Sequence, residues 1–151
     1  MLDAYYRLAE SFVNWDTISV LTYSPELKTT IDSLKLDELK KDSLVYQKAR
    51  ADLDKAIFEL SNLTGKASLD EKRVSLNLMS QHLFDFLGTI RYDINTVYYQ
   101  ECPMAFDDTL PGYWLSSSEA VRNPYLGTKH PKYKSGMLKC GAPKDSLYFA
   151  N

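Results

Sequence analysis

The sequence of 151 residues lacks several features that would place it in common functional classes. Its formal net charge is only −2, so no strong field attracts it to nucleic acid or to an anionic membrane. No apolar run approaches the roughly 18 residues that a transmembrane helix needs, so we expect no membrane span. The N-terminus has no basic region followed by an apolar one, unlike a signal peptide. Two expectations remain: a cytoplasmic protein, or a mature secreted form whose Met1 is not native.

Motifs of catalysis are missing as well. The sequence contains no Gly-rich phosphate-binding loop, no Gly-x-Ser-x-Gly elbow and no His-Glu-x-x-His zinc motif. Cys102 and His130 offer a thiol and an imidazole, but nothing in their spacing supports a catalytic pair. We therefore predict that the chain is not an enzyme and has no catalytic residues.

What is present is the composition of one globular domain, with 44% hydrophobic and 25% charged residues. Residues 1–93 have the apolar periodicity of amphipathic helices. Ser24 and Pro25 suit the start of a short second helix, and Ser68 with Glu71 forms a capping-box motif before the last one. The pattern predicts four helices, over about residues 2–12, 25–34, 45–63 and 69–90.

Residues 94–151 have a different pattern, rich in Pro, Gly and Tyr. The spacing of Pro and Gly excludes long helices and predicts turns. Only Thr96–Tyr99 has the β-branched and aromatic content of a short strand. We predict a mainly α fold in a single domain, 1–151: an antiparallel four-helix bundle, then an irregular C-terminal segment with one or two short β-strands packed on the bundle.

The aromatic residues of this C-terminal part have two interpretations. They either form a recognition surface, since Tyr and Trp suit interfaces, or they pack against the helices, which is the commoner use. The residues concerned are Tyr98, Tyr99, Tyr113, Trp114 and Tyr125.

Both cysteines lie in the same part, each next to a methionine. In an extended backbone Cys102 and Met104 face one side, and a single turn brings Met137 and Cys140 onto one face. Two thiolates and two thioethers form a soft set that selects Cu(I) or Ag(I). His130, in a loop before Met137, could add an imidazole. The sequence thus suggests a metal site with Cu(I) as its cofactor.

A disulfide explains the same two cysteines equally simply. Cysteines in an oxidising compartment form a disulfide, and closing a loop of this size stabilises a fold by about 4 kcal/mol. Because disulfide sulfurs are poor copper ligands, a Cys102–Cys140 bond and a copper site largely exclude each other in one redox state. Free thiols are the third alternative. Asp107 and Asp108, before a Pro-Gly turn, are interpreted as an ordinary polar loop.

The C-terminal part resembles a bacterial envelope domain family of unknown function. Its members pair a helical region with an ordered string of motifs, and they occur as secreted or lipid-anchored proteins and attached to periplasmic adaptor subunits of heavy-metal efflux systems. The matching motifs are Cys102-Pro103-Met104-Ala105, Gly112-Tyr113-Trp114-Leu115-Ser116, Arg122-Asn123-Pro124-Tyr125, Gly127 and Met137-Leu138-Lys139-Cys140-Gly141. One departure from the pattern is the stretch 128–136, which separates Gly127 from Met137.

The resemblance implies a periplasmic or envelope location and raises the expectation of copper or silver handling. Our first hypothesis is a periplasmic accessory protein that binds a soft metal ion. Its partners would be the ion and an efflux adaptor or other envelope protein, and it would buffer the ion or pass it on. The alternative is a non-metal protein-interaction module held together by a Cys102–Cys140 disulfide.

Overall fold

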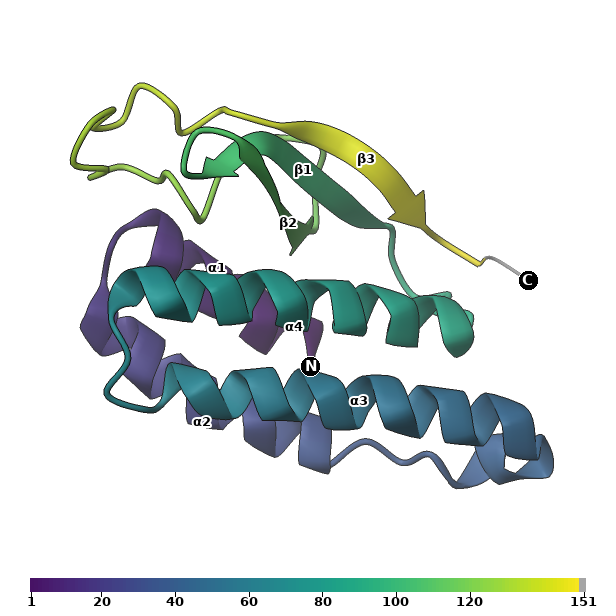
Figure 1. Cartoon of the computed structure of the whole chain (residues 1–151). Coiled ribbons are helices and arrows are strands. Elements are labelled where there is room, and N and C mark those ends of the chain that lie inside the picture. Colours follow the sequence, from purple (N-terminus) through teal and green to yellow (C-terminus); the bar gives the residue numbers. More distant parts are fainter. Residues whose placement is uncertain (150–151) are drawn as a thin grey trace.

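The computed structural model describes residues 1–149 and places a small β-sheet on a layered set of helices (Figure 1). Helices α1 and α4 form the layer next to the sheet, and α2 and α3 form the outer layer on the opposite side of the molecule. The elements in chain order are α1 (Leu2–Val13), α2 (Thr17–Asp32), the 3₁₀ helix η1 (Asp37–Lys41), α3 (Ser43–Leu63), α4 (Leu69–Thr89), β1 (Val97–Phe106), β2 (Leu110–Ser116) and β3 (Ala142–Leu147).

The helix starts follow from capping side chains. As predicted, Ser68 and Glu71 form a capping box on α4, with Glu71 N donating to Ser68 Oγ at 3.2 Å. The predicted start of the second helix at Ser24 is wrong. Asp16 caps α2 eight residues earlier by accepting a hydrogen bond from Ser19 N at 3.0 Å, and Pro25 lies inside the helix. The N-cap at Asp16 therefore sets the start of α2, and Pro25 does not.

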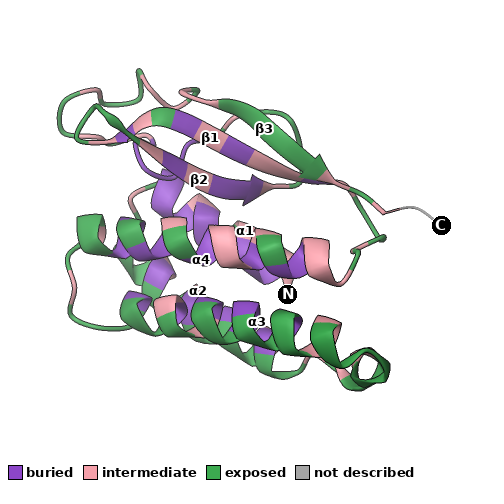
Figure 2. Ribbon diagram, turned by 45° about the vertical axis from the view of Figure 1, so that its right-hand side comes forward, coloured by how far each residue is buried: buried purple, intermediate pink, exposed green. Residues whose placement is uncertain are grey.

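The helical core is formed by the apolar stripes of the four helices. Because their polar positions face solvent, each helix buries one side, and Figure 2 shows buried residues where helices and sheet meet. The fully or nearly buried apolar side chains of the helices include Tyr5, Leu8, Phe12, Leu27, Ile31, Leu53, Leu60, Leu76, Met79, Leu83 and Phe86.

The predicted fold class is wrong for the C-terminal part, where a three-stranded antiparallel sheet replaces the irregular segment. The strand order is β2-β1-β3, so the ten-residue β1 is central and pairs on both sides. Glu101 pairs with Tyr113 of β2 and with Ala142 of β3. The sheet is therefore a principal layer of the fold and not an appendage of a helical bundle.

Two local features concealed this sheet in the sequence. Pro103 lies in the central strand, where the pairing with β2 shifts between Cys102 and Phe106, and such a bulge tolerates a residue without an N–H. Asp107 and Asp108 form the hairpin turn with φ values of 50° and 58°, although Asn-Gly is the usual signal for such a turn.

Side chains from other parts of the chain form hydrogen bonds with backbone groups on the free edge of β2. Asn77 Oδ1 of α4 accepts from Tyr113 N at 2.8 Å, and the Tyr5 hydroxyl of α1 accepts from Leu115 N at 3.0 Å. The Tyr125 hydroxyl donates to the Tyr113 carbonyl. These bonds close an edge that would otherwise expose unpaired backbone groups, and they fix the sheet on α1 and α4.

Candidate functional site

A disulfide joins Cys102 of the central strand to Cys140, two residues before β3. Their Cα atoms are 5.5 Å apart, and Cys102 is fully buried. The bond therefore anchors residues 117–141, which connect β2 to β3 and are called here the tail segment, to the middle of the sheet. The disulfide alternative is confirmed in this structure.

The predicted metal-ligating residues are only partly brought together. Cys102 and Cys140 are bonded to each other, so neither is a thiolate, which is the form that binds metal. Met104 and Met137 are half-buried and pack against the hydrophobic core. His130 Nδ1 accepts hydrogen bonds from Lys132 N and Tyr133 N, both at 3.2 Å. Over residues 1–149, no three His, Cys, Asp or Glu side chains form a cluster that could hold a metal ion.

Asn123 is a buried junction of the tail segment. Its Oδ1 accepts from Tyr125 N at 2.8 Å and Leu126 N at 3.0 Å, and its Nδ2 donates to the Cys140 carbonyl at 2.9 Å. The side chain is completely buried. The Asn123 side chain thus stabilises the turn at 123–126 and links it to the backbone of the disulfide residue Cys140. The Asn-Pro dipeptide is a turn signal, but sequence reasoning assigned Asn123 no such contact.

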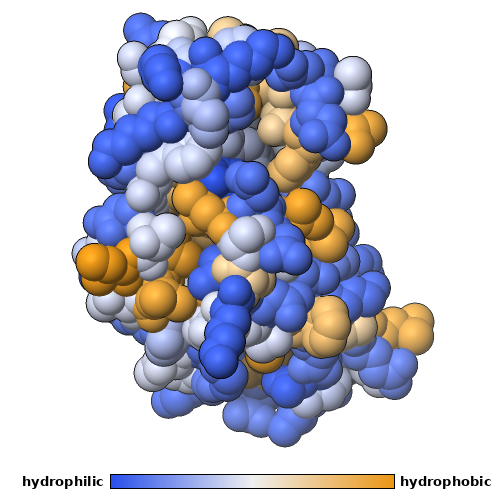
Figure 3. Space-filling view, turned by 60° about the vertical axis from the view of Figure 1, so that its left-hand side comes forward, coloured by the Kyte–Doolittle hydropathy of each residue, from blue (hydrophilic) through white to orange (hydrophobic). Residues whose placement is uncertain are grey.

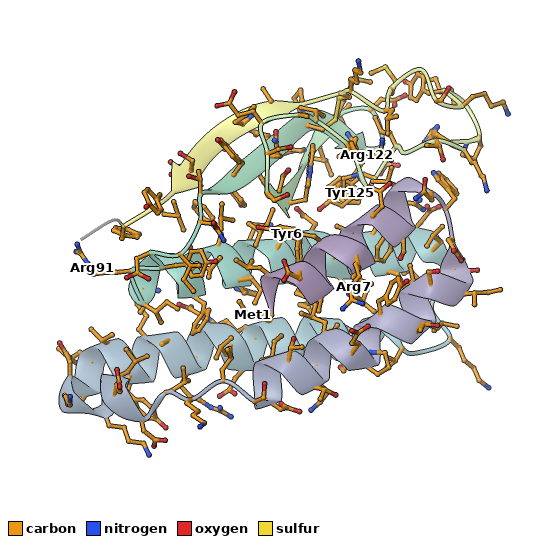
Figure 4. The ribbon with its side chains drawn as sticks, turned by 180° about the vertical axis from the view of Figure 1, so that it is seen from behind. Met1, Tyr6, Arg7, Arg91, Arg122 and Tyr125 are labelled. Carbon is orange, nitrogen blue, oxygen red and sulfur yellow. A yellow bond between two sulfur atoms is a disulfide. The ribbon has the colours of Figure 1, made fainter. Side chains whose placement is uncertain are left out.

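The tail segment is also attached to α1. Arg122 Nε donates to Glu10 Oε2 at 2.9 Å, and Thr128 N donates to the Val13 carbonyl at 2.9 Å. Figure 4 shows Arg122 and Tyr125 on the side of the tail segment that faces the helices. The Arg122-Asn123-Pro124-Tyr125 motif therefore attaches the tail segment to α1 and to the disulfide.

Arg73 of α4 lies in the same junction, with its side chain only 3% exposed. Its guanidinium carbon is 3.9 Å from the centre of the Trp15 ring, and its Nε donates to the Pro124 carbonyl at 3.3 Å. Burial lowers the pKa of Arg73 to about 10, so the group stays charged at neutral pH. Its Nη2 has no hydrogen-bond partner within residues 1–149.

Tyr99, Trp114 and Tyr125 of the predicted aromatic cluster pack in or against the core, as the second interpretation expected, whereas Tyr98 and Tyr113 are half-buried. Tyr99 stacks on Phe84 of α4 at 4.3 Å and on Tyr113 at 5.2 Å, which docks the sheet on the helix. Tyr125 meets Trp114 edge-on at 5.9 Å, and both are buried. These rings do not form an exposed recognition surface.

A groove of about 550 Å³ lies between the first turns of α4 and the β1–β2 hairpin. Two of the apolar side chains that line it, Val74 and Leu110, are 47% and 56% exposed. The face that comes forward in Figure 3 shows hydrophobic patches between hydrophilic side chains. The groove is lined by Asp70, Glu71, Arg73, Val74, Asn77, Ala105, Phe106, Asp107, Leu110, Pro111, Tyr125 and His130.

Comparison of the chain with protein-family profiles, with curated proteins and with solved structures finds no match. The resemblance to the envelope domain family therefore stays a prediction. Within residues 1–149, none of the helices combines the length and the apolar character required to cross a membrane.

Proposed function

We propose that this chain is a non-catalytic protein-interaction module of an oxidising compartment such as the periplasm, closed by the Cys102–Cys140 disulfide. The single observation that carries the proposal is this bond, together with the tail segment that it anchors. Disulfides persist in oxidising compartments and are rare in the cytosol. A tail segment fixed on α1 and α4 offers a partner a rigid surface, and binding it costs little ordering entropy.

Binding of a soft metal ion through Cys102, Met104, Met137, Cys140 and His130 is the competing hypothesis. It requires reduction of the disulfide, because thiolates and not disulfide sulfurs bind copper. The buried position of Cys102 opposes that reduction, since access is one of the factors that set the rate of thiol–disulfide exchange.

Anaerobic titration with Cu(I) in competition with a chromophoric chelator separates the two hypotheses. Protein prepared without reductant should show no titratable thiol and should leave the copper on the chelator. Met104→Ala should behave identically in this assay. Uptake of one Cu(I) per chain by the oxidised protein would contradict the proposal, and a weaker uptake by Met104→Ala would assign Met104 to the site.

Photo-crosslinking in the native host tests the interaction function itself. Benzoylphenylalanine replaces one exposed apolar residue at a time over the surface: Leu44, Ile94 or Leu110. We expect at least one position to give a defined protein adduct that purified components reproduce. The absence of such an adduct from every position would refute the interaction function.

A further inference from the structure

Two features coincide at the groove between α4 and the β1–β2 hairpin: exposed apolar side chains and an unequal set of charges. Val74 and Leu110 expose large apolar side chains at it. Asp107 and Asp108 form the hairpin turn that borders it, and their positive φ values belong to that turn. Exposed apolar side chains rimmed by polar ones are typical of interaction sites.

The charges of the groove are unequal. Asp70, Glu71 and Asp107 supply three carboxylates, whereas Arg73 supplies the one Lys or Arg side chain of the lining. Glu71 stays ionised because hydrogen bonds from Ser68 lower the pKa of its carboxyl group. An anionic ligand is therefore repelled and a cationic group is attracted.

Of these carboxylates Asp70 is paired with Arg73, whereas no ion pair within residues 1–149 involves Asp107. Lys132 of the tail segment is engaged by Asp108, the second residue of the hairpin turn, and Tyr133 donates to the same carboxylate at 2.8 Å. The Arg73 guanidinium is buried and donates to Asp70 Oδ1 at 3.3 Å, so it offsets the charge of Asp70 and presents no free surface charge to a ligand.

We propose that this groove binds an extended peptide segment of a partner protein that carries a basic side chain next to an apolar one. The basic group pairs with Asp107, and the apolar side chain lies between Val74 and Leu110. This inference rests on the proposed interaction function and names the site and the chemistry of its partner.

Selection from a random heptapeptide library displayed on phage, with the oxidised full chain as target, tests the proposal. We expect enrichment of sequences with Lys or Arg next to a large apolar residue. A selected peptide, labelled with fluorescein, then serves as the probe in polarisation measurements. Leu110→Ala should weaken its binding roughly tenfold, and Asp107→Asn roughly threefold.

Matched control variants keep the result specific to the groove. Ile94→Ala removes an exposed apolar side chain elsewhere, and Asp54→Asn removes an exposed carboxylate of α3; neither should change the affinity. Enrichment of acidic peptides, no enrichment, or equal losses in groove and control variants would each overturn the proposal. So would a dimer of the chain that Leu110→Ala dissociates, because a second copy would then be the occupant. If the groove fails while a crosslinked partner is found from Ile94 or Leu44, the interaction function survives without this site.

Discussion

The side chain of Asn123 donates to the backbone carbonyl of Cys140 at 2.9 Å and so couples the turn at 123–126 to the disulfide. The backbone N–H of Asn123 donates in parallel to the Leu138 carbonyl at 2.9 Å. These two hydrogen bonds hold the turn at 123–126 beside residues 138–140. The disulfide and this amide act as one clamp on the tail segment.

Asn123→Ala should lower the free energy of unfolding by about 2–4 kcal/mol, because it removes the partner of two buried N–H groups, those of Tyr125 and Leu126, and of the partly buried Cys140 carbonyl. Urea denaturation followed by circular dichroism measures this. Asn95→Ala, at an exposed position, is the control and should change stability by less than about 0.5 kcal/mol. Equal stability of the two variants would show that the clamp does not stabilise the fold.

Loss of the disulfide should cost about 4 kcal/mol, since it closes a loop with a sequence separation of 38. The expected result holds for the reduced protein and for the double variant Cys102→Ala, Cys140→Ala. Urea denaturation with and without reductant measures it, and the reductant should not change the double variant. A reductant that leaves the wild-type transition unmoved, although thiol titration confirms reduction, would contradict the expectation.

How much of the fold the sequence predicts depends on how local the signals are. The capping box at Ser68 and the apolar stripe of α4 are local, and both are confirmed. The sheet depends on pairing between distant segments, and β3 has almost no buried face, so its sequence carries no strand alternation. The short strand predicted at Thr96–Tyr99 lies at the start of β1, but Pro103 hid the rest of this strand, because a bulge that tolerates proline cannot be foreseen from one strand alone.

The candidate site was predictable only in part for the same reason. The cysteines could be singled out by residue type, and their pairing was one of the alternatives that remained. Arg73 carried no signal, because its burial results from Trp15 and Pro124, which approach it from other parts of the chain. The groove exists only where α4 and the unforeseen hairpin meet.

Stability should fall at alkaline pH because of Tyr5. Burial raises the pKa of its hydroxyl to about 12, while hydrogen bonds with Ser80 and Leu115 oppose the shift. The unfolded chain releases this proton near pH 10, so between about pH 10 and 12 the folded state binds more protons and loses stability as the pH rises. Below that window the contribution is fully present.

The measurement is the free energy of unfolding at a series of pH values. One such phenol gives a slope of roughly 1 kcal/mol per pH unit within the window. Burial also raises the pKa of Tyr6, Tyr99 and Tyr125, so the wild-type slope should be steeper than that. Tyr5→Phe should reduce the slope, and an unchanged slope in that variant would exclude Tyr5 as a contributor.

Gly127→Ala should destabilise the tail segment by about 3 kcal/mol or more. Gly127 has a φ of +57°, and a Cβ there would overlap the Val13 carbonyl and lie 2.8 Å from Trp15 Nε1. Gly65→Ala is the matched control, since the nearest atom to its Cβ would be 3.6 Å away. Thermal unfolding of both variants tests this, and equal midpoints would show that the tail segment can move away from α1.

Arg73 should be replaced better by an apolar side chain than by lysine. The guanidinium stacks on Trp15, and its partner Asp70 is 89% exposed, so solvent screens the attraction between their charges. Lysine keeps a buried charge but loses the flat stacking surface, whereas methionine keeps the packing and removes the charge. Urea denaturation should therefore rank Arg73→Met as more stable than Arg73→Lys, while Arg50→Lys at an exposed position leaves stability unchanged. The reverse ranking would mean that the charge itself, through Asp70 or the Pro124 carbonyl, holds α4 to the tail segment.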